Sequence, residues 1–253
     1  MMETFENIDI DALNDTRKIL ETAVAAACFD EFQKVYNNVK ALSDKYSVDN
    51  MGKRALNNTA LHMIAVALLA KNDAESASAL VKKHYTNANN MTDRLAALTD
   101  AVHLKLKCAN DLLIDFENQF GDDPLVFDNF FRVQATAPDI ETVFSVRKLL
   151  RHKRYDASNP NRIRALPGAM ALSNPVALNR ADGSGYILLC EIVSSLNDKN
   201  PHVAARILTP LLSYKRFDEA RQKLIVESLR NLLKLPNLSR SIYEKVSAAL
   251  AEN

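Results

Sequence analysis

The sequence lacks the features that mark membrane-spanning, secreted and disulfide-rich proteins. Its apolar run at residues 62–70 is much shorter than the ~18 residues that span a bilayer. The first 15 residues are acidic and have no cationic stretch followed by an apolar one, so no signal peptide is visible. Cys28, Cys108 and Cys190 fit neither a disulfide framework nor a zinc pattern. We therefore expect buried, reduced thiols and a cytoplasmic protein without a membrane partner.

The common catalytic motifs are also absent. None of the five histidines stands four residues from another with a glutamate between them, so the sequence has no HExxH zinc site. It contains neither a G-x-S-x-G elbow nor a phosphate-binding loop with its lysine. The segment GSG at 183–185 is interpreted as a turn before a helix. The net charge of +1 gives no general attraction to nucleic acid.

Glycine and proline are scarce, with five and eight residues in 253. Both residue types interrupt helices, and no segment alternates with the period of two that indicates a strand. The caps and the apolar spacing predict helices at residues 11–27, 30–42, 51–70, 73–86, 91–107, 108–120, 124–135, 138–151, 184–197, 201–214, 218–234 and 239–251, with short pieces near 160–171 and 175–179.

Helix pairs therefore recur every ~35–40 residues, a rhythm typical of HEAT and armadillo repeats. We predict an all-α fold, a superhelical stack of antiparallel helix pairs, as a single domain over residues 1–253. Asn-Pro at 159–160, 174–175 and 200–201 predicts helix starts with an asparagine cap. Pro210 is expected to interrupt its helix.

One stretch differs from the rest. Residues 156–186 hold three of the five glycines and three of the eight prolines, within an irregular insert expected at 152–185. A long irregular segment in a helical array is a candidate functional surface.

A second candidate surface is the basic run RKLLRHKR at 147–154. Such a run suggests a nucleic-acid-binding patch, with steeply salt-dependent binding. It also lies at the expected C-terminus of a helix, where cations complement the helix dipole. The low net charge and the lack of interleaved aromatic residues favour the solvated helix end and no nucleic-acid partner.

Six blocks of sequence closely resemble one family, the bacterial aminopeptidase N group of zinc metallopeptidases, over its C-terminal helical domain. The similarity runs from about residue 15 to the end. The blocks are NNMTDRLAALT (89–99), DPLVFDNFFRVQATA (123–137), SNPNRIRALPGA (158–169), DGSGYILL (182–189), NPHVAARILTPL (200–211) and LSRSIYEKVSAALA (238–251).

The resemblance implies that zinc and the catalytic chemistry belong to an upstream domain with HExxH and GAMEN motifs. Residues 168–172, GAMAL, share three letters with the latter by coincidence. This chain would then be a fragment without a cofactor or catalytic residues of its own, and inactive by itself. Its expected partners are the catalytic domain of the same polypeptide and peptide substrates. It would roof the active site and restrict the size of the substrate.

The resemblance also marks three residues of the substrate cavity. Arg164 and Arg206 match family arginines that face the cavity, and His202 matches a position where relatives often have glutamine. The hypothesis is that the arginines supply positive charge for the carbonyls or the carboxylate of a peptide. In the alternative, they pair with an acid such as Asp182 or Glu191 and only hold the insert in place. His202 would make the preference for the N-terminal residue depend on pH.

A function of another class also remains open. A free-standing helical-repeat module could bind a protein or peptide on its concave face. An in-frame HExxH domain in the preceding coding sequence would decide in favour of the aminopeptidase.

Overall fold

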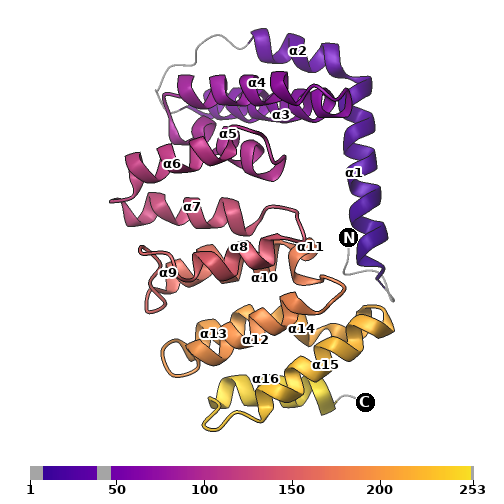
Figure 1. Cartoon of the computed structure of the whole chain (residues 1–253), viewed down its shortest axis with the longest axis vertical. Coiled ribbons are helices and arrows are strands. Elements are labelled where there is room, and N and C mark those ends of the chain that lie inside the picture. Colours follow the sequence, from indigo (N-terminus) through magenta and orange to yellow (C-terminus); the bar gives the residue numbers. More distant parts are fainter. Residues whose placement is uncertain (1–7, 39–46, 252–253) are drawn as a thin grey trace. The chain divides into compact units, whose positions relative to one another are not determined.

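The computed structural model describes residues 8–38 and 47–251, and its regular elements in these ranges are helices (Figure 1). The exception to helix is an isolated parallel bridge between Ile8 and Phe217. The prediction of an all-α fold is confirmed. The last residues of the helix predicted at 30–42 lie outside the described ranges. No helix within the described ranges combines the length and the apolar character that crossing a membrane requires.

The helices up to residue 120 are α1 (Ile10–Ala27), α2 (Phe29–Asn38), α3 (Val48–Ala70), α4 (Ala74–Asn87), α5 (Met91–His103) and α6 (Ala109–Phe120). The later elements are α7 (Pro124–Ala135), α8 (Thr142–Leu149), α9 (Pro160–Ile163), the π-helix η2 (Arg164–Gly168), α10 (Ala169–Ser173), α11 (Pro175–Leu178), α12 (Ser184–Leu196), α13 (Pro201–Ile207), α14 (Thr209–Leu212), the 3-10 helix η3 (Tyr214–Arg216), α15 (Glu219–Leu233) and α16 (Arg240–Ala251).

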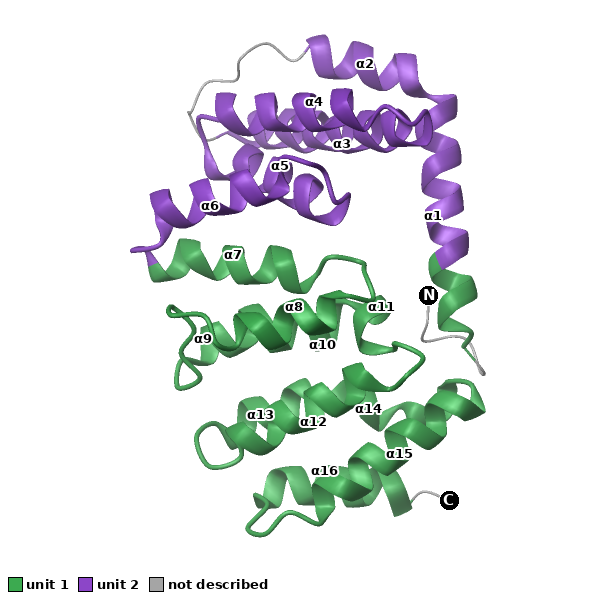
Figure 2. Cartoon of the chain, viewed as in Figure 1, with its two compact units in different colours: residues 1–14, 124–253 green, residues 15–123 purple. Residues whose placement is uncertain are grey.

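The chain forms two compact units, one of residues 1–14 with 124–253 and one of residues 15–123 (Figure 2). The second unit stacks consecutive helices, since each helix from α2 to α5 packs against the helix that follows it in the chain. The links between α3, α4, α5 and α6 are short, which makes these neighbouring helices antiparallel. That residues 1–253 act as one domain stays a prediction.

Within the first unit, the helices form two rows. In one, here called the η2 row, η2 packs between α7 and α13, and α13 packs against α16. In the other, called the α12 row, α12 packs between α8 and α15. The rows join through the pairs α7–α8, α12–α13 and α15–α16. This is the two-layer packing of helical repeats.

The insert at 152–185 contributes to the core of this unit. Every residue from 165 to 171, in η2 and α10, is buried. Pro167 lies inside the π-helix η2, which belongs to the η2 row. A Cβ on Gly168 would lie 3.1 Å from the carbonyl oxygen of Ile163, so this wide turn has little space for a side chain. The insert is therefore a buried helical segment with exposed ends.

Asparagine side chains hold the start of two of these short helices, as predicted. Oδ1 of Asn159 accepts from the N–H of Asn161, and Oδ1 of Asn174 accepts from the N–H of Ala177. Asn200 does not cap α13 with its side chain. Its amide donates instead to the carbonyls of residues 157 and 158 in the insert. The predicted interruption at Pro210 is present, since α13 ends at Ile207 and α14 begins at Thr209.

Candidate functional site

The two predicted cavity arginines lie on elements that pack against each other, η2 and α13. The contact is close, because a Cβ on Gly168 of η2 would lie 3.5 Å from Cγ2 of Ile207 in α13. Arg164 is exposed although residues 162–163 and 165–171 are buried. It thus projects from the edge of a buried segment, which fixes its backbone firmly.

Helix α13 presents the other two predicted residues on one face. His202 and Arg206 are both exposed and are four residues apart, a spacing that places side chains on the same side of a helix. The opposite side is buried, with Ala204, Ile207 and Leu208 in the core. The structure therefore places all three predicted residues on exposed positions of two adjacent elements in the η2 row.

The two acids named above as alternative partners of the arginines, Asp182 and Glu191, are bound to other residues. Asp182 accepts from Nε of Arg180 at 2.8 Å and from the hydroxyl of Ser184 at 2.6 Å. Glu191 lies 2.8 Å from Nη2 of Arg147. The alternative in which Asp182 or Glu191 pairs with Arg164 or Arg206 is therefore not what the structure shows.

Arg164 and Arg206 keep their charge available. Nη1 of Arg164 donates to Oδ1 of Asn161 at 3.2 Å, an exposed contact to a neutral side chain. Neither arginine forms an ion pair with any acid in residues 8–38 or 47–251. Residues 160–168 and 201–207 contain no acidic residue, so α9, η2 and α13 together carry a net positive charge.

A different arginine holds the insert in place. Nη1 of the buried Arg162 lies 3.2 Å from Oδ1 of the buried Asp128 in α7. The guanidinium also lies over the rings of Phe127 and Phe131. Burial raises the pKa of Asp128, although the Arg162 charge opposes the shift. No local pattern shows which arginine of NPNRIR points inward, because both have the same chemistry.

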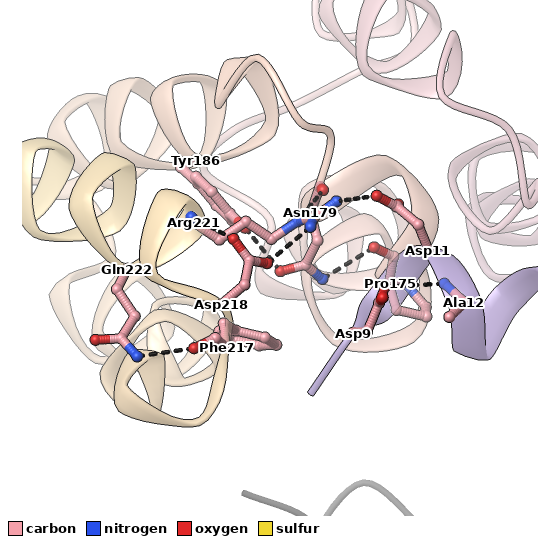
Figure 3. A network of polar contacts seen from close by, with 10 residues as sticks. All are labelled: Asp9, Asp11, Ala12, Pro175, Asn179, Tyr186, Phe217, Asp218, Arg221 and Gln222. Atoms are coloured by element: carbon pink, nitrogen blue, oxygen red, sulfur yellow. Dashed lines mark hydrogen bonds and ion pairs between the residues drawn. The ribbon is translucent and has the colours of Figure 1, made fainter. Parts of the chain in front are cut away.

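A polar network holds the other end of the insert (Figure 3). The hydroxyl of the fully buried Tyr186 donates to Oδ1 of Asn179 at 2.9 Å. Nε of Arg221 in α15 donates to the backbone carbonyl of Asn179 at 2.9 Å. Nη1 of Arg221 donates to Asp218, and Nη2 donates to Asp11. This network is structural, since its charges are paired with one another.

The basic run at 147–154 is partly used inside the fold. Arg147 pairs with Glu191, and Arg154 lies over the ring of Phe127. The His152 ring lies within 6.0 Å of three phenylalanine rings. Helix α8 ends at Leu149 within the run, as expected for a helix end, but part of the run packs against the fold and is not fully solvated.

The described residues, 8–38 and 47–251, contain no group of three or more His, Cys, Asp or Glu side chains that could hold a metal ion. The GAMAL segment is buried from Gly168 to Ala171. All three cysteines are free thiols, and burial raises the pKa of Cys190 to about 12, which keeps that thiol protonated at neutral pH.

Known proteins match the chain along almost its full length. The model of a family described as a domain of unknown function (DUF3458_C) with ARM repeats matches residues 1–251. Aminopeptidase N of Escherichia coli K12 is 39% identical over 251 residues, which are 99% of this chain and 28% of that protein. Aminopeptidase N of Haemophilus influenzae is 38% identical over 248 residues, 98% of this chain and 28% of that protein.

A solved structure has the same fold. It is the crystal structure of Legionella pneumophila aminopeptidase A in complex with aspartic acid, which superposes with a TM-score of 0.89 at 23% identity. The match covers 100% of this chain and 30% of that one. The chain spans 28% of the length of the curated relatives described above. It belongs to the DUF3458_C family of ARM-repeat domains and is similar to the C-terminal portion of bacterial aminopeptidase N.

Proposed function

We propose that this chain is the non-catalytic helical domain of a zinc-dependent aminopeptidase. We further propose that its η2–α13 face, the surface that carries Arg164 on η2 and Arg206 on α13, supplies positive charge to peptide substrates. Its partners are then the catalytic domain of the same polypeptide and the peptide itself. The observation that carries the proposal is the similarity of almost the whole chain to one segment of aminopeptidase N. Zinc and the bond-breaking step belong to the remainder of that polypeptide.

The exposed arginines support the second part of the proposal. Arg164 and Arg206 project from buried, rigid elements and have no described acidic partner. An arginine stays charged at all physiological pH values, and its planar fork can bind a carboxylate with two hydrogen bonds. Each arginine is therefore suited to hold a peptide carbonyl or the C-terminal carboxylate without moving far.

The helical domain would contribute binding and not chemistry. By covering the active site, it would exclude bulk water, which strengthens the electrostatic contacts to the substrate. It would also admit peptides and unfolded chain ends while rejecting folded proteins. His202, one turn before Arg206 on the same face, would lie close enough to influence which substrates are preferred.

Steady-state kinetics of the intact aminopeptidase test the proposal. A lost hydrogen bond to a charged group costs ~1.5–3 kcal/mol, which is roughly a 10- to 100-fold loss of binding. Arg206→Ala should therefore raise KM for short peptides with little change in kcat, as expected for an interaction made equally in the ground state and the transition state. Unchanged kinetics would reject the role of Arg206.

A further inference from the structure

Lys245, in the neighbouring helix α16 of the η2 row, brings a third positively charged side chain to α13. Nζ of Lys245 in α16 donates to the backbone carbonyl of Ala205 at 3.1 Å. Ala205 directly precedes Arg206 in the chain. Because a carbonyl oxygen lies within ~3 Å of the next Cα, the Lys245 ammonium lies within roughly 6 Å of the Cα of Arg206.

This position leaves the ammonium group partly free. A lysine ammonium has three donor protons, and one of them is used on the carbonyl of Ala205. Lys245 is exposed and forms no ion pair with any of the described acids. The acid one position before it, Glu244, is bound to Arg240 at 2.6 Å. The Lys245 ammonium therefore lies beside the backbone of Arg206, and neither side chain has a counter-ion among the described residues.

Like charges that lie side by side are mildly destabilising. The carbonyl of Ala205 holds the lysine ammonium next to the residue that bears the arginine. An anion that binds both cations would remove the repulsion. The two groups would also complement each other, since arginine grips a carboxylate with a planar fork and lysine adds a compact charge.

We propose that Lys245 is a second binding residue at the Arg206 subsite, and that the two side chains together bind the C-terminal carboxylate of the peptide. This inference rests on the proposed function and adds a residue to it. The ligand chemistry is a free carboxylate at the end of the substrate, in preference to a backbone carbonyl. Peptides with an amidated C-terminus should then lose the contribution of both residues.

The test compares a tripeptide that has a free C-terminus with its C-terminal amide in the intact aminopeptidase. Lys245→Gln should raise KM for the free acid roughly 5- to 20-fold and leave kcat and the KM of the amide nearly unchanged. Lys245→Arg should restore most of the loss. Lys223→Gln removes the same charge from an exposed position of α15 in the α12 row and should change neither KM.

The outcomes separate the possible roles. If Lys245 only holds the end of α13, Lys245→Gln will raise KM for acid and amide alike, and the proposal is wrong. If Arg206→Ala discriminates between acid and amide while Lys245→Gln does not, the pairing fails but the proposed function stands. If neither variant changes any kinetic constant, the charge role of this face fails as well.

Discussion

The carboxylate of Asp11 accepts a 2.8 Å hydrogen bond from Arg221, although 210 positions separate the two residues in the chain. Arg221 is the centre of this contact, because it also binds the carbonyl of Asn179 and the carboxylate of Asp218. Its side chain is 9% exposed, while that of Asp11 is 68% exposed. The start of α1, the end of the insert and α15 thus meet at one buried guanidinium.

This asymmetry in burial predicts unequal effects of mutation. Arg221→Met leaves the buried carbonyl of Asn179 without a donor and leaves the Asp218 carboxylate with only the backbone N–H of residue 221, which we expect to cost about 3 kcal/mol. Asp11→Asn removes only a solvent-exposed partner and should cost less than about 1 kcal/mol. Urea denaturation followed by circular dichroism measures both. Equal losses would show that the network depends on the exposed ion pair and not on the buried donor.

A second prediction concerns His62, which joins two acids in the unit of residues 15–123. Its Nδ1 lies 2.7 Å from Asp100 and its Nε2 lies 3.0 Å from Glu21. The hydrogen bond to Asp100 raises the pKa of His62 to about 9, against the effect of burial. The folded state therefore holds a proton that an ordinary histidine loses near pH 6.5.

The stabilisation from protonated His62 is fully present below about pH 6.5 and is lost as the pH rises through about 9. We expect the difference in unfolding free energy between the wild type and His62→Gln to shrink by roughly 2 kcal/mol between pH 6.5 and pH 10. A constant difference would contradict the charged pair.

The control is His84, whose pKa is lowered by burial. It bonds to the neutral partners Tyr36 and Asn58, so its ring is uncharged in the folded state near neutral pH. Its contribution should instead fall as the pH drops below about 6.5, because unfolding then takes up a proton. His84→Gln should therefore show the opposite dependence on pH.

A third prediction uses the close approach of α12 and α11. A Cβ on Gly185 would lie 2.2 Å from the carbonyl oxygen of Leu178 and 2.6 Å from that of Ala177. These are backbone atoms, so the contact cannot be relieved by a side-chain rotation. Gly185→Ala should destabilise the protein by about 3 kcal/mol or more, measured by thermal or urea unfolding.

Gly52 is a matched control, because a Cβ there has no atom within 4 Å and the residue lies inside helix α3. Alanine is favoured over glycine in a helix by about 1 kcal/mol. Gly52→Ala should therefore stabilise the protein slightly. If both variants behave alike, the tight packing of α12 on α11 is not as described.

Local signals predicted much of this fold. Asn159 and Asn174 start helices because an asparagine oxygen followed by a proline satisfies the free N–H groups of the first turn, and both caps are present. Asn200 has the same local sequence, yet its amide binds the insert. The carbonyls that accept from this amide, those of residues 157 and 158, lie more than 40 residues before Asn200 in the chain. This tertiary contact, which the local sequence does not specify, takes the place of the cap at the start of α13.

The orientation of side chains was harder to predict. The helical spacing of Ile19 and Leu20 in α1 resembles a buried face, but these side chains are 69% and 63% exposed. Periodicity shows which residues share a side of a helix, and it does not show whether another element covers that side. Lys245 lay within a matching block at 238–251, but its link to Ala205 depends on packing that no local pattern specifies.

We propose that Arg164 and Arg206 supply positive charge to the carbonyls or the C-terminal carboxylate of a peptide, and binding of the carboxylate is the sharpest form of this central claim. The most direct measurement is the ratio of KM values for a tripeptide and its C-terminal amide, in the intact aminopeptidase and in its Arg164→Ala/Arg206→Ala variant. We predict that KM for the free acid rises by about 100-fold or more, because two charged hydrogen bonds are lost, while KM for the amide and both kcat values change little. An unchanged ratio would contradict the claim.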